Sequence, residues 1–253
     1  MRAQDRRAYL TFAQTKAYAR RVDVARRLLT EASQRGPIVI CTSWGKDSIA
    51  LCHLAIETLG RVPLFHMATA YRLPGDDEVV EYFQARTDVH VLESRLTLDE
   101  YINFAKTVGL PHERPGGNAG AKRSKAKRAG EWAEEHGFTV QALGLRIAEK
   151  GPRAALLRTK GPLYQLVDGT SRVHPLAYFT HTDVWATIVA NDLPYNRRIY
   201  DAETHGLTRE TIRNTGWLST DGAHHGRIGW LKEHFPEHYA QLEAHFPRIR
   251  HFL

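Results

Sequence analysis

The six residues 43–48, Ser-Trp-Gly-Lys-Asp-Ser, combine the groups that bind phosphate. The hydroxyls of Ser43 and Ser48 can donate hydrogen bonds, Gly45 lets the backbone approach an anion closely, and Lys46 carries a full positive charge. The carboxylate of Asp47 would repel a phosphate, so we expect a cation such as Mg²⁺ to be shared between the two. The hexapeptide therefore predicts a site for the phosphates of a nucleotide.

This hexapeptide lies between a predicted strand and a predicted helix. Residues 38–42 form a short apolar run that is typical of a strand buried on both faces of a parallel sheet, and residues 46–59 have the apolar spacing of a helix that Gly60 ends. The N-terminus of such a helix offers unpaired N–H groups and about half a positive charge. A Walker A loop is excluded, because Ile40 and Asp47 occupy the places of its first Gly and its Ser or Thr.

Strands and helices alternate along the chain around this loop. Further strands are predicted at 62–67, 89–92, 138–145 and 172–176, with helices at 76–85, from 97 onward, at 122–136 and at 180–189. This alternation predicts an α/β fold with a doubly wound, mostly parallel sheet. Residues 1–35 predict a basic N-terminal helix, 36–201 the nucleotide-binding domain, and 202–253, where only helical spacing remains, a helical C-terminal appendage.

Composition narrows the classes of protein that fit. With 253 residues, of which 42% are hydrophobic, the chain can bury a full core, so disorder and collagen-like repetition are excluded. Its apolar stretches are shorter than the roughly 20 residues that span a bilayer. With only two cysteines, Cys41 and Cys52, and no signal-peptide pattern, we expect a cytoplasmic protein without a membrane segment.

The net charge of +7 is concentrated in two segments. Residues 1–35 hold nine Lys and Arg against three acids, and residues 112–128 hold six against one. Such segments attract polyanions, either nucleic acid or the phosphates of a nucleotide, although they are also typical of solvated surfaces.

The hexapeptide and three later segments resemble a known family. Ser-x-Gly-Lys-Asp-Ser after a first strand resembles the PP-loop of the adenine-nucleotide α-hydrolase superfamily, and residues 49–54 are similar to its phosphoadenosine phosphosulfate (PAPS) reductase and ATP sulfurylase small-subunit branch. The later segments agree in order and spacing. They are 63–69 with Leu73-Pro74, then 143–146 with Glu149 and Arg153, and then the run made of 174–176, 183–185 and 193–196 with Tyr200-Asp201. The resemblance covers about residues 36–201. Ala68 and Ala70 depart from it, because they replace the usual Asp and Gly.

The resemblance implies that ATP or a similar nucleotide is cleaved between its α- and β-phosphates, with PAPS or adenylyl sulfate as the alternative bound nucleotide. It implies pyrophosphate held by the loop while an acceptor attacks the α-phosphorus, so that positive groups must surround that atom. The implied catalytic residues are Lys46, Asp47, Arg146 and Arg153. The implied nucleotide-binding residues are Ser43, Gly45, Lys46, Asp47, Ser48, Gly144 and the adenine-seating strand residues Phe65, His66 and Met67. On the basic helix, Arg123, Lys125 and Lys127 would face the substrate anion, and Arg146 could alternatively form only a surface ion pair with Glu149.

Departures from the family affect its redox chemistry. A thioredoxin-linked PAPS reductase needs a nucleophilic cysteine in its C-terminal tail, but no cysteine follows Cys52. In the segment 213–218, Trp217 stands where relatives often have a cysteine. Because an iron–sulfur cluster is usually held by four cysteines, we expect none here.

Three functions therefore remain open. The first is an enzyme that cleaves ATP at the α–β bond to adenylylate an acceptor or activate sulfur. The second is a sulfonucleotide reductase that uses an external thiol. The third is a nucleic-acid-modification or defence-associated binding protein. The expected partners are an adenine nucleotide, nucleic acid at the basic segments, and a partner subunit or a second copy.

Overall fold

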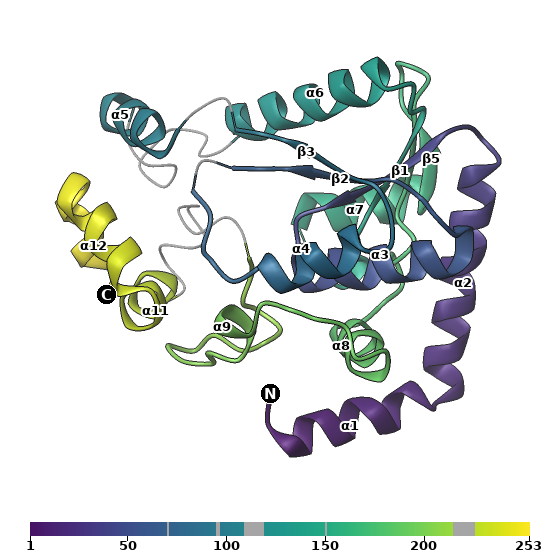
Figure 1. Ribbon diagram of the computed structural model, residues 1–253, viewed down its shortest axis with the longest axis horizontal. Coiled ribbons are helices and arrows are strands. Elements are labelled where there is room, and N and C mark those ends of the chain that lie inside the picture. The colour runs from purple at the N-terminus through teal and green to yellow at the C-terminus, as the bar shows by residue number, and fades with distance from the viewer. Residues whose placement is uncertain (70, 95–96, 109–118, 150, 215–225) are drawn as a thin grey trace. The chain divides into compact units, whose positions relative to one another are not determined.

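A six-stranded sheet forms the centre of the computed structural model, which describes residues 1–69, 71–94, 97–108, 119–149, 151–214 and 226–253. The strands are β1 (Ile38–Thr42), β2 (Leu64–Met67), β3 (Val89–Leu92), β4 (Val140–Leu143), β5 (Leu163–Gln165) and β6 (Ser171–Val173). Their order is β3-β2-β1-β4-β6-β5 (Figure 1). All neighbours are parallel except β5, which pairs antiparallel with β6. The sheet is therefore α/β and mostly parallel, as predicted.

The order of the strands reverses beside β1. The chain moves outward from β1 to β2 and β3 in one direction, and later to β4 and β6 in the other. In open α/β sheets, ligands bind at such a switch point, in the crevice outside the carboxyl ends of the two strands. The loops that leave β1 and β4 lie at this position.

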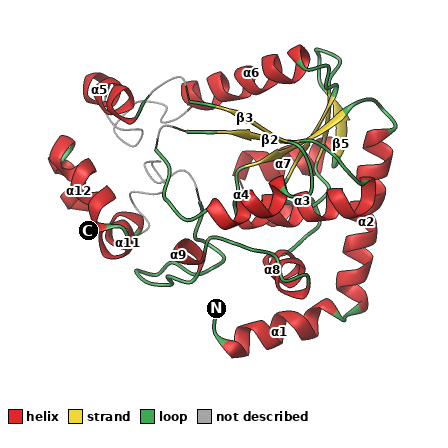
Figure 2. Cartoon of the chain, in the orientation of Figure 1, coloured by secondary structure: helices red, strands yellow, loops and turns green. Residues whose placement is uncertain are grey.

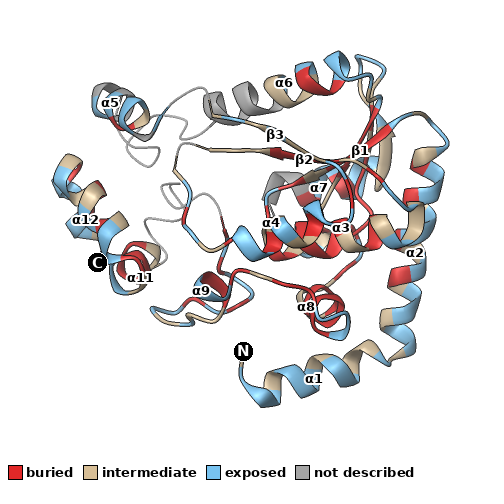
Figure 3. Cartoon of the chain, viewed as in Figure 1, coloured by how far each residue is buried: buried red, intermediate tan, exposed pale blue. Residues whose placement is uncertain are grey.

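Helices cover both faces of the sheet (Figure 2). On one face, α2 (Lys16–Ser33) and α3 (Lys46–Leu59) pack against β1, β4 and β6, and α8 (His181–Ala190) packs on α3. On the other face, the Trp132 ring of α6 (Ala119–Glu135) stacks on Phe65 of β2, with ring centroids 4.1 Å apart. Most of α8 is buried, as Figure 3 shows, and this explains its largely apolar sequence. The sheet is doubly wound because both of its faces are covered.

The N-terminal segment forms two helices rather than the single helix expected. Helix α1 (Ala3–Ala13) ends before Thr15, whose hydroxyl accepts a hydrogen bond from the Tyr18 N–H at 3.2 Å and so begins α2. A Thr at this position starts a new helix because it satisfies an N–H that has no intrahelical partner. Helix α1 packs on α8, and the buried side of α2 consists of Val22, Ala25, Leu29 and Ala32.

An ion pair connects α2 to α8. Arg21 contacts both carboxylate oxygens of Asp183, at 3.0 and 3.1 Å, and the Asp183 side chain is fully buried. Asp183 also accepts hydrogen bonds from the N–H and hydroxyl of Thr180, which completes a capping box at the start of α8. One carboxylate thus stabilises both the end of a helix and the packing of two helices.

The chain divides into two compact units, 1–67 with 76–92 and 131–195, and 68–75 with 93–130 and 196–253. The remaining helices are α4 (Asp77–Gln84) and α7 (Gly151–Lys160) in the first unit, and α5 (Leu98–Val108), α9 (Arg197–Tyr200), α11 (Arg227–His234) and α12 (Pro236–His245) in the second; short 3-10 turns cover Ile147–Glu149 and Pro247–Phe252. The expected boundaries after residues 35 and 201 stay a prediction.

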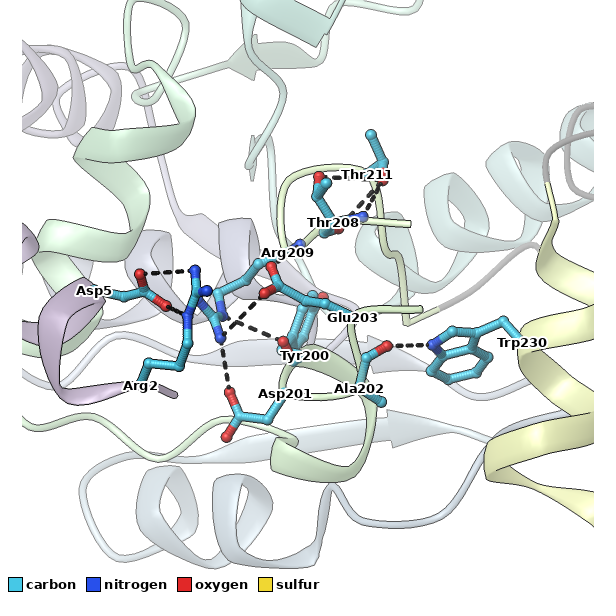
Figure 4. A network of polar contacts seen from close by, with 10 residues as sticks. All are labelled: Arg2, Asp5, Tyr200, Asp201, Ala202, Glu203, Thr208, Arg209, Thr211 and Trp230. Carbon is cyan, nitrogen blue, oxygen red and sulfur yellow. Dashed lines mark hydrogen bonds and ion pairs between the residues drawn. The ribbon is translucent and has the colours of Figure 1, made fainter. Parts of the chain in front are cut away.

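The second unit has its own buried side chains and polar contacts. Leu231, Phe235, Tyr239, Leu242, Phe246 and Ile249, whose spacing predicts helices, are all buried. Buried Arg209 donates to the Tyr200 carbonyl at 3.2 Å and contacts Asp201, and the Trp230 indole donates to the Ala202 carbonyl at 2.6 Å (Figure 4). These contacts fix the chain that follows α9.

Strand β5 and the helices α7 and α9 were not expected from the sequence. Strand β5 is only three residues long, and its residues are half-buried or exposed, so it lacks the apolar run that marks a strand. Helix α7 begins with Gly151-Pro152 and has a weak apolar stripe. The predicted loop 115–118 lies outside the described residues. Within the described part of the chain, no helix combines the length and the apolar character needed to cross a bilayer.

We predict that Asp183→Ala lowers the free energy of unfolding by about 3 kcal/mol, because it leaves Arg21 without its carboxylate and removes the capping box. Denaturant unfolding followed by circular dichroism measures this loss. The matched control is Arg6→Ala, which breaks the exposed pair with Asp192 and should change stability by less than about 0.5 kcal/mol. Equal effects of the two substitutions would contradict the structural role of Asp183.

Candidate nucleotide site at the carboxyl ends of β1 and β4

The loop 43–45 joins β1 to α3 and is closed by side-chain hydrogen bonds. The Ser48 hydroxyl donates to the Gly45 carbonyl at 3.0 Å and accepts from the Ser43 N–H at 3.2 Å. The hydroxyls of Ser43 and Ser48 are 3.2 Å apart. Gly45 is the N-cap of α3 and has no side chain to cap the helix, so the first-turn N–H groups of α3 face the loop. The Ser48 hydroxyl is thus used to shape the loop.

Trp44 is a residue of this loop that the sequence analysis did not single out. Its backbone has a φ of 58°, in the left-handed region that a bulky residue rarely adopts, and its side chain is 1% exposed. The indole packs against His66 of β2 and Phe83 of α4, with centroids 5.5 and 5.9 Å away. The burial of this large ring offsets the backbone strain, which is of order 1–3 kcal/mol. No spacing rule in the sequence marks this role.

Lys46, Asp47 and Arg146 form a chain of ion pairs beside the loop. The Lys46 ammonium is 3.2 Å from one Asp47 oxygen, and the Arg146 Nε is 2.6 Å from the other. Lys46 and Arg146 are only 4% and 5% exposed. The Arg146 Nε is also 3.6 Å from Glu149, so the ion pair that was considered as an alternative role for Arg146 exists as well. The structure therefore brings together three of the four expected catalytic residues.

This arrangement gives Asp47 two cationic neighbours from the chain itself. The expectation of Mg²⁺ was based on the need for a cation between Asp47 and phosphate. Lys46 and Arg146 already occupy both sides of that carboxylate. Asp47 therefore has a structural reason to be in the loop that does not require a metal ion.

Gly144 allows the loop after β4 to lie directly against the start of α3. A Cβ atom at this position would be 3.2 Å from the Asp47 carbonyl oxygen and 3.4 Å from the Ser48 nitrogen, both backbone atoms that cannot turn away. Parallel pairing of Cys41 with Leu143 makes the two loops begin at the same edge of the sheet. Because the loops approach closely, Arg146 lies within contact distance of Asp47.

The strand expected to seat adenine is paired on both sides. Phe65 and His66 pair with Cys41 and Thr42 of β1 and with β3, whereas Met67 pairs only with β3. The side chain of His66 is buried, and its Nδ1 donates to the Thr42 carbonyl at 3.1 Å. On the β1 side, unpaired main-chain groups therefore begin at Met67.

The other expected site residues are not brought to this cluster by the described structure. Arg153 lies in the first turn of α7, and Arg123 and Lys125 lie in α6, but their side chains are outside the described part. Lys127 is exposed on α6, and Arg128 donates to the Glu93 carbonyl at 3.0 Å. Of the segment 213–218, residues 215–218 with Trp217 lie outside the described residues.

Neither cysteine has the environment of a nucleophile. Burial raises the pKa of Cys41 and of Cys52 to about 12. A thiol with such a pKa carries almost no thiolate at neutral pH. Cys52 is buried on α3, and Cys41 is half-buried in β1.

Comparison with known proteins places the chain in a family. Residues 37–230 match the family model described as the phosphoadenosine phosphosulfate reductase domain. The chain belongs to this family. Membership supports a nucleotide-utilising enzyme and agrees with the resemblance found in the sequence. No curated protein matches the chain significantly.

Solved structures with a similar fold have low sequence identity. The PAPS reductase from Candida auris, in a phosphate complex, has 18% identity and a TM-score of 0.49, with 68% of this chain and 82% of that chain covered. The U34-tRNA thiolase NcsA from Methanococcus maripaludis has 14% identity and a TM-score of 0.48, with coverage of 91% and 80%. The NMN synthetase from Francisella tularensis has 13% identity and a TM-score of 0.46, with coverage of 68% and 71%.

One expectation is corrected by these comparisons. From the sequence we expect ATP or a sulfonucleotide with Mg²⁺ and no iron–sulfur cluster, but NcsA is described with its [4Fe-4S] cluster. The exclusion is therefore wrong as a rule for proteins of this fold. Among the described residues, no group of three or more His, Cys, Asp and Glu side chains is arranged to hold a metal ion.

We predict that Gly144→Ala lowers the free energy of unfolding by about 1–3 kcal/mol, because the added methyl group forces apart two backbone segments. Thermal unfolding monitored by circular dichroism tests this prediction. Gly130→Ala is the matched control, since a Cβ there meets nothing within 4 Å and the residue lies inside α6. The control should be neutral or more stable by about 0.5–1 kcal/mol. A neutral Gly144→Ala variant would show that the close approach is not required.

We also predict that neither thiol of the native protein reacts with iodoacetamide at pH 8, whereas both react once the chain is unfolded. The folded pKa values lie above the value of 9.0 in the unfolded chain, so this contribution to stability is complete below pH 9 and is lost as pH rises toward 12. Mass spectrometry of the alkylated protein counts the modified cysteines. Rapid modification of Cys41 or Cys52 in the folded protein would contradict the raised pKa of that thiol.

Proposed function

We propose that this protein binds ATP at the loop 43–48 and cleaves it between the α- and β-phosphates, with transfer of the adenylyl group to an acceptor or to activate sulfur. The observation that supports the proposal is the nearly complete burial of the Lys46 and Arg146 cations beside the N-terminus of α3. Burying a long cationic side chain is costly unless it has a partner. Two such cations at a switch point suit a strongly anionic ligand.

In the proposed step, an oxygen or sulfur atom of the acceptor forms a bond to the α-phosphorus. The bond from that phosphorus to the bridging oxygen breaks, the electron pair leaves with pyrophosphate, and the proton of the acceptor passes to solvent. Lys46 and the first-turn N–H groups of α3 would stabilise the leaving pyrophosphate, because charge builds up on it as the bond breaks. Arg146 would stabilise the α-phosphate or the acceptor.

Asp47 would act by holding both cations before the nucleotide arrives. Its carboxylate lies between Lys46 and Arg146, and the lysine contact, at 3.2 Å, is the longer of the two. A phosphate that enters the loop would take over the lysine contact, while the shorter Arg146 contact would keep the two loops together. This exchange of partners at Lys46 would explain why an Asp directly follows the phosphate-binding Lys.

The adenine would be held by main-chain groups at the end of β2, where pairing with β1 stops at His66. Met67 is therefore the strand residue that we assign to this contact, rather than Phe65. Arg153 and the basic helix residues Arg123, Lys125 and Lys127 remain assigned to the substrate anion as a proposal. Their positions in α7 and α6 follow the order of the family motifs.

The sulfonucleotide reductase is the less favoured reading. Such a reaction requires a thiolate to attack the sulfonate sulfur. Both thiols of this chain have a pKa raised by burial, so the nucleophile would have to come from another molecule. Sulfite release from PAPS in the presence of thioredoxin would favour this reading over ATP cleavage.

We predict that Lys46→Ala lowers pyrophosphate release from ATP by about 10²–10³-fold, a loss typical of removing a group that stabilises transition-state charge. Asp47→Ala should also lower it, because Lys46 and Arg146 lose the carboxylate that positions them. The assay measures pyrophosphate with Mg²⁺ present and with sulfate or other nucleophiles offered as acceptor.

Binding is measured before activity, as thermal stabilisation of the protein by ATP, adenylyl sulfate and PAPS. A ligand at one hundred times its Kd adds about 2.7 kcal/mol to the free energy of unfolding.

The matched controls are Arg61→Ala and Asp88→Ala. These residues form an exposed pair before β2 and β3, at the amino ends of the strands and so away from the loop. Both controls should retain full nucleotide stabilisation and activity. A Lys46→Ala variant that is stabilised by ATP as strongly as the original protein would refute the proposed site.

A further inference from the structure

The helices α1 and α2 carry positive charge that the proposed site does not use. They precede residue 37, where the match to the family model begins, so the family's nucleotide chemistry does not account for them. Within residues 1–35, nine Lys and Arg face three acids. The structure separates these nine residues into two groups.

The first group consists of arginines whose charge is already paired. Arg2 pairs with Asp5, Arg6 with Asp192, Arg21 with Asp183 and Arg35 with Glu31, at 2.8 to 3.3 Å. Arg21 is the helix-to-helix contact described above. These four residues have structural or local partners.

The second group has no acidic partner within 4.0 Å in the described part of the chain. It consists of Arg7, Lys16, Arg20, Arg26 and Arg27. All five are exposed. Their charge is therefore available to another molecule.

Three of these cations form a line on the outer side of α2. At 3.6 residues per turn, Lys16, Arg20 and Arg27 lie within about 40° of one another around the helix axis, and they are separated along it by about 6 and 10 Å. The buried residues Val22 and Leu29 lie on the opposite side. We call Lys16, Arg20 and Arg27 the outer line of α2. A duplex of nucleic acid presents about ten phosphate charges over the same length of axis.

The surroundings of the outer line favour a duplex over other polyanions. Binding of a single strand usually needs exposed rings for base stacking, but Tyr9 and Tyr18 are half-buried, and the Tyr18 hydroxyl is 3.1 Å from that of Thr187. Binding to a membrane surface needs several exposed large apolar side chains. Within the two helices, only Leu10, at 38% exposed, is of this kind.

We propose that the outer line of α2 binds the phosphate backbone of a nucleic-acid duplex. The predominance of arginine over lysine in the unpaired group suits phosphate, because the guanidinium group can donate two parallel hydrogen bonds. Contacts made to phosphate alone carry no base information, so binding is independent of sequence. Asp23 is exposed on the same side of α2, and its negative charge repels the phosphates of the ligand.

The test compares two triple variants with equal loss of charge. Lys16→Gln/Arg20→Gln/Arg27→Gln removes the outer line, and Arg2→Gln/Arg6→Gln/Arg35→Gln removes three paired arginines. Fluorescence anisotropy with 20-base-pair DNA and RNA duplexes gives Kd between 50 and 200 mM salt. Removing the outer line should raise Kd at least tenfold at 50 mM and reduce the slope of log K against log salt by about 2.7, whereas the control should change Kd by less than about threefold.

A single substitution adds a change in the opposite direction. Asp23→Asn should tighten duplex binding by about two- to fivefold and leave stabilisation by ATP unchanged, because it removes the acid between Arg20 and Arg27, whereas Glu31 on the same side is paired with Arg35. Equal weakening by the two triple variants would overturn the proposal in favour of a general charge effect. Binding of a single strand or of polyglutamate as tightly as a duplex would also overturn it. Stabilisation by ATP in all these variants keeps the result separate from the proposed function.

Discussion

The contact between Arg146 and Asp47 holds the candidate site together, because it joins the loop after β4 to the loop after β1. The strands themselves place the two loops side by side, but backbone pairing between β1 and β4 stops at Cys41 and Leu143. Beyond that point the separation is set by the absence of a side chain at Gly144 and by the 2.6 Å ion pair. A site at a switch point needs both features. Without the ion pair the two loops would separate, and with a side chain at position 144 the crevice between them would be filled.

The loop also depends on a residue held in an unfavourable conformation. Trp44 has a positive φ, and the packing of its ring between His66 and Phe83 compensates for the strain. The direction of the chain at Gly45, and with it the aim of the first N–H groups of α3, follows from this turn. A phosphate-binding loop that is rigid before the ligand arrives loses less entropy on binding.

Much of the fold could be predicted from the sequence, because its strong elements carry local signals. The apolar run 38–42 and the helix 46–59 match β1 and α3, and the capping residues Thr180 and Asp183 mark the start of α8. The break at Thr15 and the short strand β5 could not be predicted in the same way, since one depends on a single cap and the other on pairing with β6. In the site, the motif identified Lys46, Asp47 and Arg146, but their mutual pairing and the role of Trp44 arise from tertiary contacts that no spacing encodes.

The cations around the loop 43–48 and the cations on α2 imply different ways of binding anions. Around the loop, Lys46 and Arg146 are matched by Asp47 and Glu149, so the cluster has no formal net charge and exerts little attraction at a distance. A ligand must compete with these carboxylates at short range, which a compact polyphosphate can do better than a single weak anion. On α2, by contrast, the cations are exposed and unpaired within the described residues, so their attraction extends over about a Debye length and weakens with salt. Burial and pairing, rather than the number of basic residues, therefore decide how a positive cluster binds its ligand. Buried and paired cations select a ligand by its shape, whereas exposed and unpaired cations attract any polyanion by charge.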